Sequence, residues 1–78
     1  MNTDEILLKL TGIFREELDN NTINLTSEST AEDIEEWNSL SHIQLIVAVE
    51  KAFNIRFISS EILSWNNVGE MVESIKSK

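Results

Sequence analysis

The chain has 78 residues, of which 41% are hydrophobic and 26% charged, and this balance predicts one small globular domain spanning residues 1–78. Because cysteine is absent, a disulfide framework, a cysteine-based zinc site and a thiol nucleophile are excluded. Fourteen acidic and six basic residues give a net charge of −8, which disfavours nucleic-acid binding and favours partners with basic surfaces. No apolar run approaches the roughly 20 residues that span a membrane, and residues 1–9 lack the features of a signal peptide, so we expect a cytoplasmic protein.

The apolar spacing is helical, and the lack of proline and the presence of only two glycines argue against a strand-and-turn fold. A first helix is predicted from a cap at Thr3 to about Leu18, with one apolar face made of Ile6, Leu7, Leu10, Ile13 and Phe14. Gly12 lies inside this helix, and a closely approaching backbone would explain it. Residues 19–21, Asp-Asn-Asn, are expected to end the helix.

A long polar stretch follows, to about Asn38, and a structureless loop of this length in a small domain is usually either functional or a misread element. One helical turn is possible within residues 30–36. Nine acidic residues and no basic residue lie between Arg15 and Lys51, either as a solvated surface or as a docking surface. The spacing fails the calcium-loop pattern, because Ile23 stands where an oxygen ligand belongs. The apolar residues that could hold the loop against the core are Ile23, Leu25, Ile34 and Trp37.

A second helix is predicted from Asn38 or Ser39 to about Phe53, and it carries two apolar stripes on opposite sides. A domain this small can hardly bury a helix of roughly 22 Å on every side. One stripe therefore packs the core, and the other is predicted to bind a partner, with burial beneath the long loop as the alternative. The core stripe is Leu45, Ile46, Val49, Ala52 and Phe53, and the second stripe is Leu40, Ile43 and Val47.

Two shorter helices are predicted after an extended connector at residues 54–58. The first is capped by Ser59 or Ser60 and runs from Glu61 to about Trp65. The second is capped by Asn66 or Asn67, and Lys76 and Lys78 suit its C-terminal end. Its buried stripe is expected to be Val68, Met71, Val72 and Ile75.

The residues offer no complete catalytic set. His42 is the only histidine and follows Ser39 by three positions, but no third group evidently orients its imidazole, and one histidine cannot build a metal site. We therefore expect neither an enzyme nor a metal centre. Ser39 lies where free backbone N–H groups and the helix dipole would favour a phosphate ester, and an ordinary capping residue is the alternative reading of this position.

Residues 36–53, EWNSLSHIQLIVAVEKAF, resemble the acyl carrier protein family. The family signature is Asp-Ser-Leu at the start of the second of four helices, followed by an apolar helix that ends in Glu-x-x-Phe. Farther along, Phe57, Glu61 and Val68 match in order and spacing. The resemblance covers essentially the whole chain, including the long loop. It implies an all-α, right-handed four-helix bundle with a long loop between the first two helices and a short third helix.

The resemblance also implies a function. Ser39 would carry 4′-phosphopantetheine, which a phosphopantetheinyl transferase moves from coenzyme A, and the terminal thiol would hold an acyl group as a thioester. The chain, expected as a monomer, would deliver that group between enzymes of a fatty acid, polyketide or specialised acyl pathway. The alternative is an unmodified interaction domain on the same fold. The residues that would meet the basic docking surfaces of acyl-loading and acyl-accepting enzymes are Leu40, Ile43, Val47, Glu35, Glu36 and Glu50.

Some positions depart from the family pattern. Asn38 stands where the family usually has aspartate, so a charge that could help the transferase is lost. Ser41 and Gln44 also replace commonly acidic residues, as does Lys51. The positions that match the family's acyl-binding interior are Val49, Phe57, Ile62 and Trp65. Because tryptophan is bulky there, we expect a short or polar acyl group, or one left outside the bundle; the alternative is that this tryptophan simply fills the core.

Overall fold

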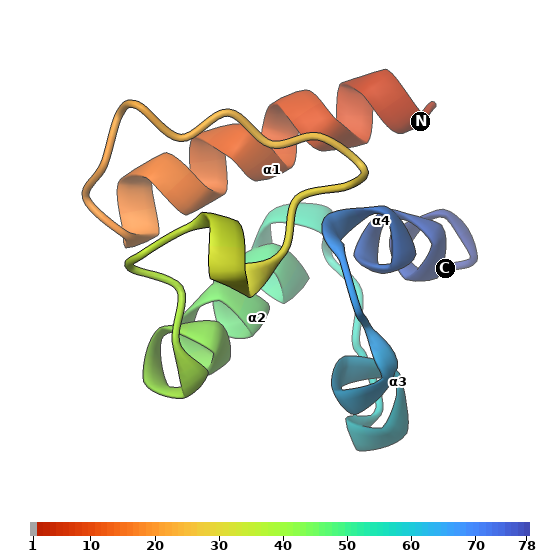
Figure 1. The fold of residues 1–78 in the computed structure, drawn as a ribbon. Coiled ribbons are helices and arrows are strands. Elements are labelled where there is room, and N and C mark those ends of the chain that lie inside the picture. Colours follow the sequence, from red (N-terminus) through yellow and green to blue (C-terminus); the bar gives the residue numbers. More distant parts are fainter. Residues whose placement is uncertain (1) are drawn as a thin grey trace.

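A computed structural model describes residues 2–78, and in these residues the chain forms four α-helices and one short 3₁₀ helix (Figure 1). The elements are α1 Thr3–Glu17, η1 Ala31–Asp33, α2 Ser39–Phe53, α3 Ser59–Ser64 and α4 Val68–Lys76. The all-helical prediction is confirmed, with its long loop before α2 and its short third helix. None of the helices in the described residues is long and apolar enough to cross a membrane.

The cap of the first helix lies one residue earlier than predicted. Asn2 caps α1, because its Oδ1 accepts the Glu5 N–H at 2.8 Å while Glu5 Oε1 accepts the Asn2 N–H at 3.4 Å. Thr3 lies inside the helix, so its assignment as the cap is wrong. At the other end Asp19 has a φ of 51°, a left-handed conformation that aspartate tolerates. The prediction that residues 19–21 end this helix is confirmed.

The core lies between α1, α2, α4 and the long loop, and α1 contacts both of the other helices. All four loop residues that were expected to reach the core are buried, which confirms that prediction. Figure 1 shows the loop running back along α1 toward α4 before it turns into η1. Each apolar side chain buried in this way contributes roughly 1.5–3 kcal/mol, so the loop is firmly attached. The loop residues concerned are Ile23, Leu25, Ile34 and Trp37.

The two glycines have opposite surroundings. A Cβ added at Gly12 would meet nothing within 4 Å, so the close approach of backbone expected there is wrong. The close approach occurs at Gly69, where an added Cβ would lie 2.8 Å from the carbonyl oxygen of Ser27. The same carbonyl accepts the Gly69 N–H at 2.8 Å, and Ser29 O accepts the Val68 N–H at 2.8 Å. The long loop is thus joined directly to the start of α4.

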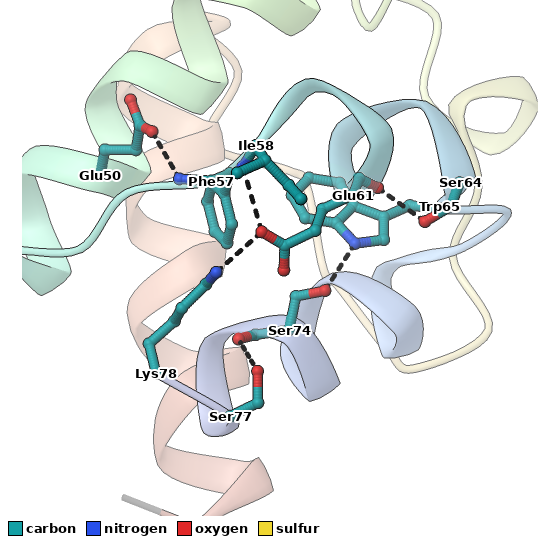
Figure 2. A network of polar contacts seen from close by, with 9 residues as sticks. All are labelled: Glu50, Phe57, Ile58, Glu61, Ser64, Trp65, Ser74, Ser77 and Lys78. Atoms are coloured by element: carbon teal, nitrogen blue, oxygen red, sulfur yellow. Dashed lines mark hydrogen bonds and ion pairs between the residues drawn. The ribbon is translucent and has the colours of Figure 1, made fainter.

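The third helix differs from its prediction in its start and its cap. It begins at Ser59 rather than Glu61, and the residue before it is Ile58, whose N–H donates to Glu61 Oε1 at 3.1 Å. Glu61 also pairs with Lys78 at 2.7 Å, and Figure 2 shows this pair joining α3 to the end of the chain. The Lys78 side chain therefore pairs with α3, while its backbone N–H donates to the carbonyl oxygen of Ile75 in the last turn of α4 at 3.1 Å. Asn67 caps α4 as predicted, through the Glu70 N–H at 2.9 Å.

Candidate functional site

Ser39 is the first residue of α2, and its side chain is exposed. The capping role belongs to Asn38, whose Oδ1 accepts the N–H groups of Leu40 and Ser41 at 3.0 Å each. The backbone N–H of Asn38 donates in turn to Ser41 Oγ at 2.8 Å, which completes a reciprocal cap. The hydroxyl of Ser39 is consequently not needed to hold the helix, and the capping alternative applies to its neighbour instead.

Ser41 has a structural role that the sequence analysis missed. It is buried, and its Oγ donates to the carbonyl oxygen of Glu36 at 2.8 Å while accepting the Asn38 N–H. These bonds fix the end of the long loop against the first turn of α2. The replacement of a commonly acidic residue by serine therefore places a small hydroxyl where the chain must pack closely. A polar residue three positions after the cap was the available signal.

His42 is oriented by Trp37. The indole Nε1–H donates to His42 Nδ1 at 3.0 Å, and the two rings stack with centroids 5.9 Å apart. Because Nδ1 accepts this bond, the neutral imidazole is assigned its proton on Nε2. Burial lowers the pKa of His42, which favours that neutral form. The lone pair that a general base would need to accept the Ser39 proton is thus already bonded to an indole N–H. The group that orients the imidazole, which the sequence analysis did not find, is Trp37.

A cavity of about 420 Å³ opens beside Ser39, between the start of α2, α3 and the turn before α4. Apolar side chains make much of its wall, including Trp37, Ile43, Ile62 and Trp65, and His42 lines it as well. Its volume falls within the range of roughly 300–1,000 Å³ that is common for small-molecule sites. An exposed hydroxyl at the edge of such a cavity fits a flexible organic group attached to that hydroxyl and free to fold back onto the protein.

Only some of the positions expected to line an acyl-binding interior line the cavity. Ile62 and Trp65 line the cavity, but Val49 is fully buried in the core. The Phe57 ring packs edge-on against Trp65, with centroids 4.9 Å apart. Trp65 is itself fixed by its Nε1–H, which donates to Ser74 Oγ at 2.8 Å (Figure 2). Trp65 is therefore both part of the packing and a wall of the cavity.

The second apolar stripe of α2 is exposed. Leu40, Ile43 and Val47 have 76%, 60% and 45% of their surfaces accessible, so the alternative of burial beneath the loop is wrong. On the opposite side the core stripe is buried as predicted at Leu45, Ile46 and Val49. Its last two members differ, because Ala52 is exposed and Phe53 is half-buried. The exposed stripe begins next to Ser39.

The three acidic residues predicted to meet a partner are not equivalent. Glu35 is exposed, whereas Glu36 is half-buried and accepts the Asn20 Nδ2–H at 2.8 Å. Glu50 is half-buried, and its Oε2 accepts the Phe57 N–H at 2.9 Å (Figure 2). Two of the three carboxylates therefore hold loops in place, a role that the sequence analysis did not assign to them.

Comparison with known proteins decides the family. The family model described as "Phosphopantetheine attachment site" matches residues 8–75. The chain is 30% identical to the acyl carrier protein of Borreliella burgdorferi strain ZS7 over 78 residues, which cover all of this chain and 98% of that protein. The chain belongs to the acyl carrier protein family. An acyl carrier protein of Borrelia garinii subsp. bavariensis gives the same identity and coverage.

A solved acyl carrier protein has the same fold. The solution NMR structure of the holo acyl carrier protein from Geobacter metallireducens matches with a TM-score of 0.88 and 41% identity, over 94% of this chain and 84% of that one. Acyl carrier proteins are carriers rather than enzymes, and they bear a phosphopantetheine prosthetic group that a transferase attaches. They interact with biosynthetic enzymes. The exposed hydroxyl and adjoining cavity of this chain fit such a group.

Proposed function

We propose that Ser39 is the residue to which 4′-phosphopantetheine is attached, and that the chain delivers an acyl group from there to enzymes of one biosynthetic pathway. The observation that carries this proposal is that the residues which cap α2 are not the residue whose hydroxyl is exposed at its start. Asn38 and Ser41 complete the helix cap, and the Ser39 hydroxyl stays exposed at the edge of the cavity. Ser39 also occupies the serine position of the family motif.

The start of α2 suits a phosphodiester. The positive end of the helix dipole lies there, and the first turn contains no acidic residue that would repel the phosphate. Asn38 keeps the helix cap at the position where the family usually has aspartate, so the substitution removes a charge but preserves the start of the helix. When bound, the prosthetic group supplies a thiol that the cysteine-free chain cannot provide. The protein residues position the attachment oxygen and leave it accessible to a transferase.

The exposed stripe Leu40, Ile43 and Val47 supports a docking role beside the attachment serine. Three exposed aliphatic side chains on one helix face favour an apolar contact, and the net charge of −8 favours a basic rim around it. Glu35 is exposed and can meet such a rim directly. Glu36 and Glu50 add to the negative potential while they hold their loops. We expect the carrier to act as a monomer of one domain in the cytoplasm.

The wall of the cavity supports a proposal about cargo. Trp65 is fixed by its bond to Ser74 and by its edge-on contact with Phe57, so its bulky ring occupies space beside the cavity that a long chain would need. We therefore infer a short or polar acyl group, or one that stays outside the bundle. Strong chemical-shift changes at buried Val49 on loading with a long chain would contradict this inference.

The attachment proposal is tested by intact mass spectrometry after incubation with coenzyme A, magnesium and a broad-specificity phosphopantetheinyl transferase. The native chain should gain one phosphopantetheine, and Ser39→Ala should gain none. Ser59→Ala is the matched control, because Ser59 is also an exposed serine at the first position of a helix, and it should be modified like the native chain. Failure of the native chain, with circular dichroism showing that it is folded, would favour the unmodified interaction domain.

A further inference from the structure

The imidazole of His42 is a fixed hydrogen-bond donor in the wall of the cavity. The indole of Trp37 donates to its Nδ1, so its proton is on Nε2, and its ring lies between two tryptophans. On the second side the Trp65 ring meets it edge-on, with centroids 6.5 Å apart and an interplanar angle of 79°. Within residues 2–78, the bond from Trp37 is the hydrogen bond found for this imidazole, and it occupies Nδ1. The Nε2–H is therefore available to donate to a ligand.

His42 is also close to the point of attachment. It follows Ser39 by three residues on α2, a spacing that places two side chains on the same face with Cβ atoms roughly 5–6 Å apart. Both residues line the same cavity. A group that leaves the Ser39 oxygen and folds into this cavity therefore starts close to the imidazole. Its part nearest to the phosphate is therefore the part that His42 can reach.

The chemistry of the cavity wall suits an uncharged ligand with oxygen acceptors. No acidic or basic side chain other than neutral His42 lines it among the described residues, although the whole chain carries a net charge of −8. Apolar side chains, among them Ile62 and Trp65, make much of the remaining wall. Beyond its phosphate, a phosphopantetheine arm has a dimethyl-substituted carbon, a hydroxyl and two amides. It thus pairs apolar carbon with neutral acceptors, as the cavity requires.

We propose that His42 is a positioning residue for the arm on Ser39, whose hydroxyl or first amide carbonyl accepts the His42 Nε2–H while Ile62 and Trp65 cover its apolar carbon. The inference rests on the proposed attachment at Ser39. Its consequence is that the holo arm spends part of its time folded against α2 and α3 instead of extending freely into solvent. Trp37 sets the tautomer, so it contributes without touching the arm.

The test compares apo and holo protein by NMR, with mass spectrometry confirming one phosphopantetheine on each holo sample. On loading, the native chain should show shifts of the His42 Nε2 signal and of the Trp65 indole, and contacts between arm protons and Ile62. His42→Leu should lower the ratio of folded-back to free arm by about 2- to 10-fold, as expected for one lost hydrogen bond. His42→Gln keeps an N–H donor near the Nε2 position and should restore most of that ratio.

Two further variants separate positioning from general packing. Trp37→Phe keeps an aromatic ring but removes the N–H, so the imidazole nitrogen shifts should change to those of mixed tautomers and the folded-back population should fall. Gln44→Leu changes an exposed residue of α2 and should leave the arm signals as in the native chain. The inference is overturned if fully loaded native protein shows unchanged cavity signals, or if His42→Leu retains the native shifts. Absence of loading would instead refute the attachment at Ser39.

Discussion

A methyl group added at Gly69 should destabilise the protein, although alanine is normally preferred over glycine inside a helix. The new Cβ would lie 2.8 Å from the carbonyl oxygen of Ser27 and 3.2 Å from the Ser27 Cβ. That carbonyl cannot move freely, because it accepts the Gly69 N–H while Ser29 O accepts the Val68 N–H. Overpacking costs about 1–3 kcal/mol and alanine regains about 1 kcal/mol of helix propensity, so we expect a net loss centred on about 1 kcal/mol and reaching about 2 kcal/mol.

Gly12→Ala is the matched control. Gly12 is exposed in α1, and its added Cβ meets nothing within 4 Å, so the same substitution should stabilise the chain by about 0.5–1 kcal/mol. Thermal unfolding followed by circular dichroism resolves both changes, because 1 kcal/mol shifts the Tm of a domain this size by roughly 4–8 °C. Opposite signs at the two positions are expected. A Gly69→Ala protein as stable as Gly12→Ala would refute the close packing of the long loop on α4.

Three further outcomes are expected. Val47→Asp, in the exposed stripe, should change stability by less than about 0.5 kcal/mol but raise the KM of the transferase for the chain; an unchanged KM would contradict the docking role. Burial lowers the pKa of His42, so the folded chain binds that proton less readily than the unfolded one. Denaturant stability should therefore fall as the pH drops from about 7.5 to about 5.5, and His42→Gln should abolish this part of the slope. Lys78 holds the pKa of Glu61 below its usual value through their hydrogen-bonded ion pair. Glu61→Gln removes this pair and should speed amide hydrogen exchange in α3 but not in α1. High salt should have the same effect on the native chain, because it screens the pair.

The helices were largely predictable from the sequence because each carries a periodic apolar face and a local end signal. The bounds of α2 and the Asn67 cap of α4 follow from neighbouring residues alone. The errors concern the N-terminal ends of α1 and α3, where the hydrogen bond that fixes the start of the helix involves a residue other than the predicted cap. Asn2 replaces Thr3 because its side chain meets Glu5, and α3 starts early because Glu61 reaches back to the Ile58 N–H. In both cases a glutamate lies three residues after the true cap, which is the spacing of a capping box.

The site was predictable where it depends on spacing along α2 and unpredictable where it depends on packing between segments. Exposure of Leu40, Ile43 and Val47 follows from the helical period. The bond from Trp37 to His42 joins the loop to the helix, and periodicity contains no information about a ring orientation across that junction. The contact of Ser27 with Gly69 joins segments far apart in the sequence, so only the folded chain reveals which of the two glycines is required.

Fragmentation mass spectrometry of the loaded chain tests most directly whether Ser39 carries the prosthetic group. We expect one phosphopantetheine on fragments that contain Ser39 and none on fragments that contain Ser59, the other exposed serine at the start of a helix. A group found on any other serine, or full modification of the Ser39→Ala variant, would contradict the proposed attachment.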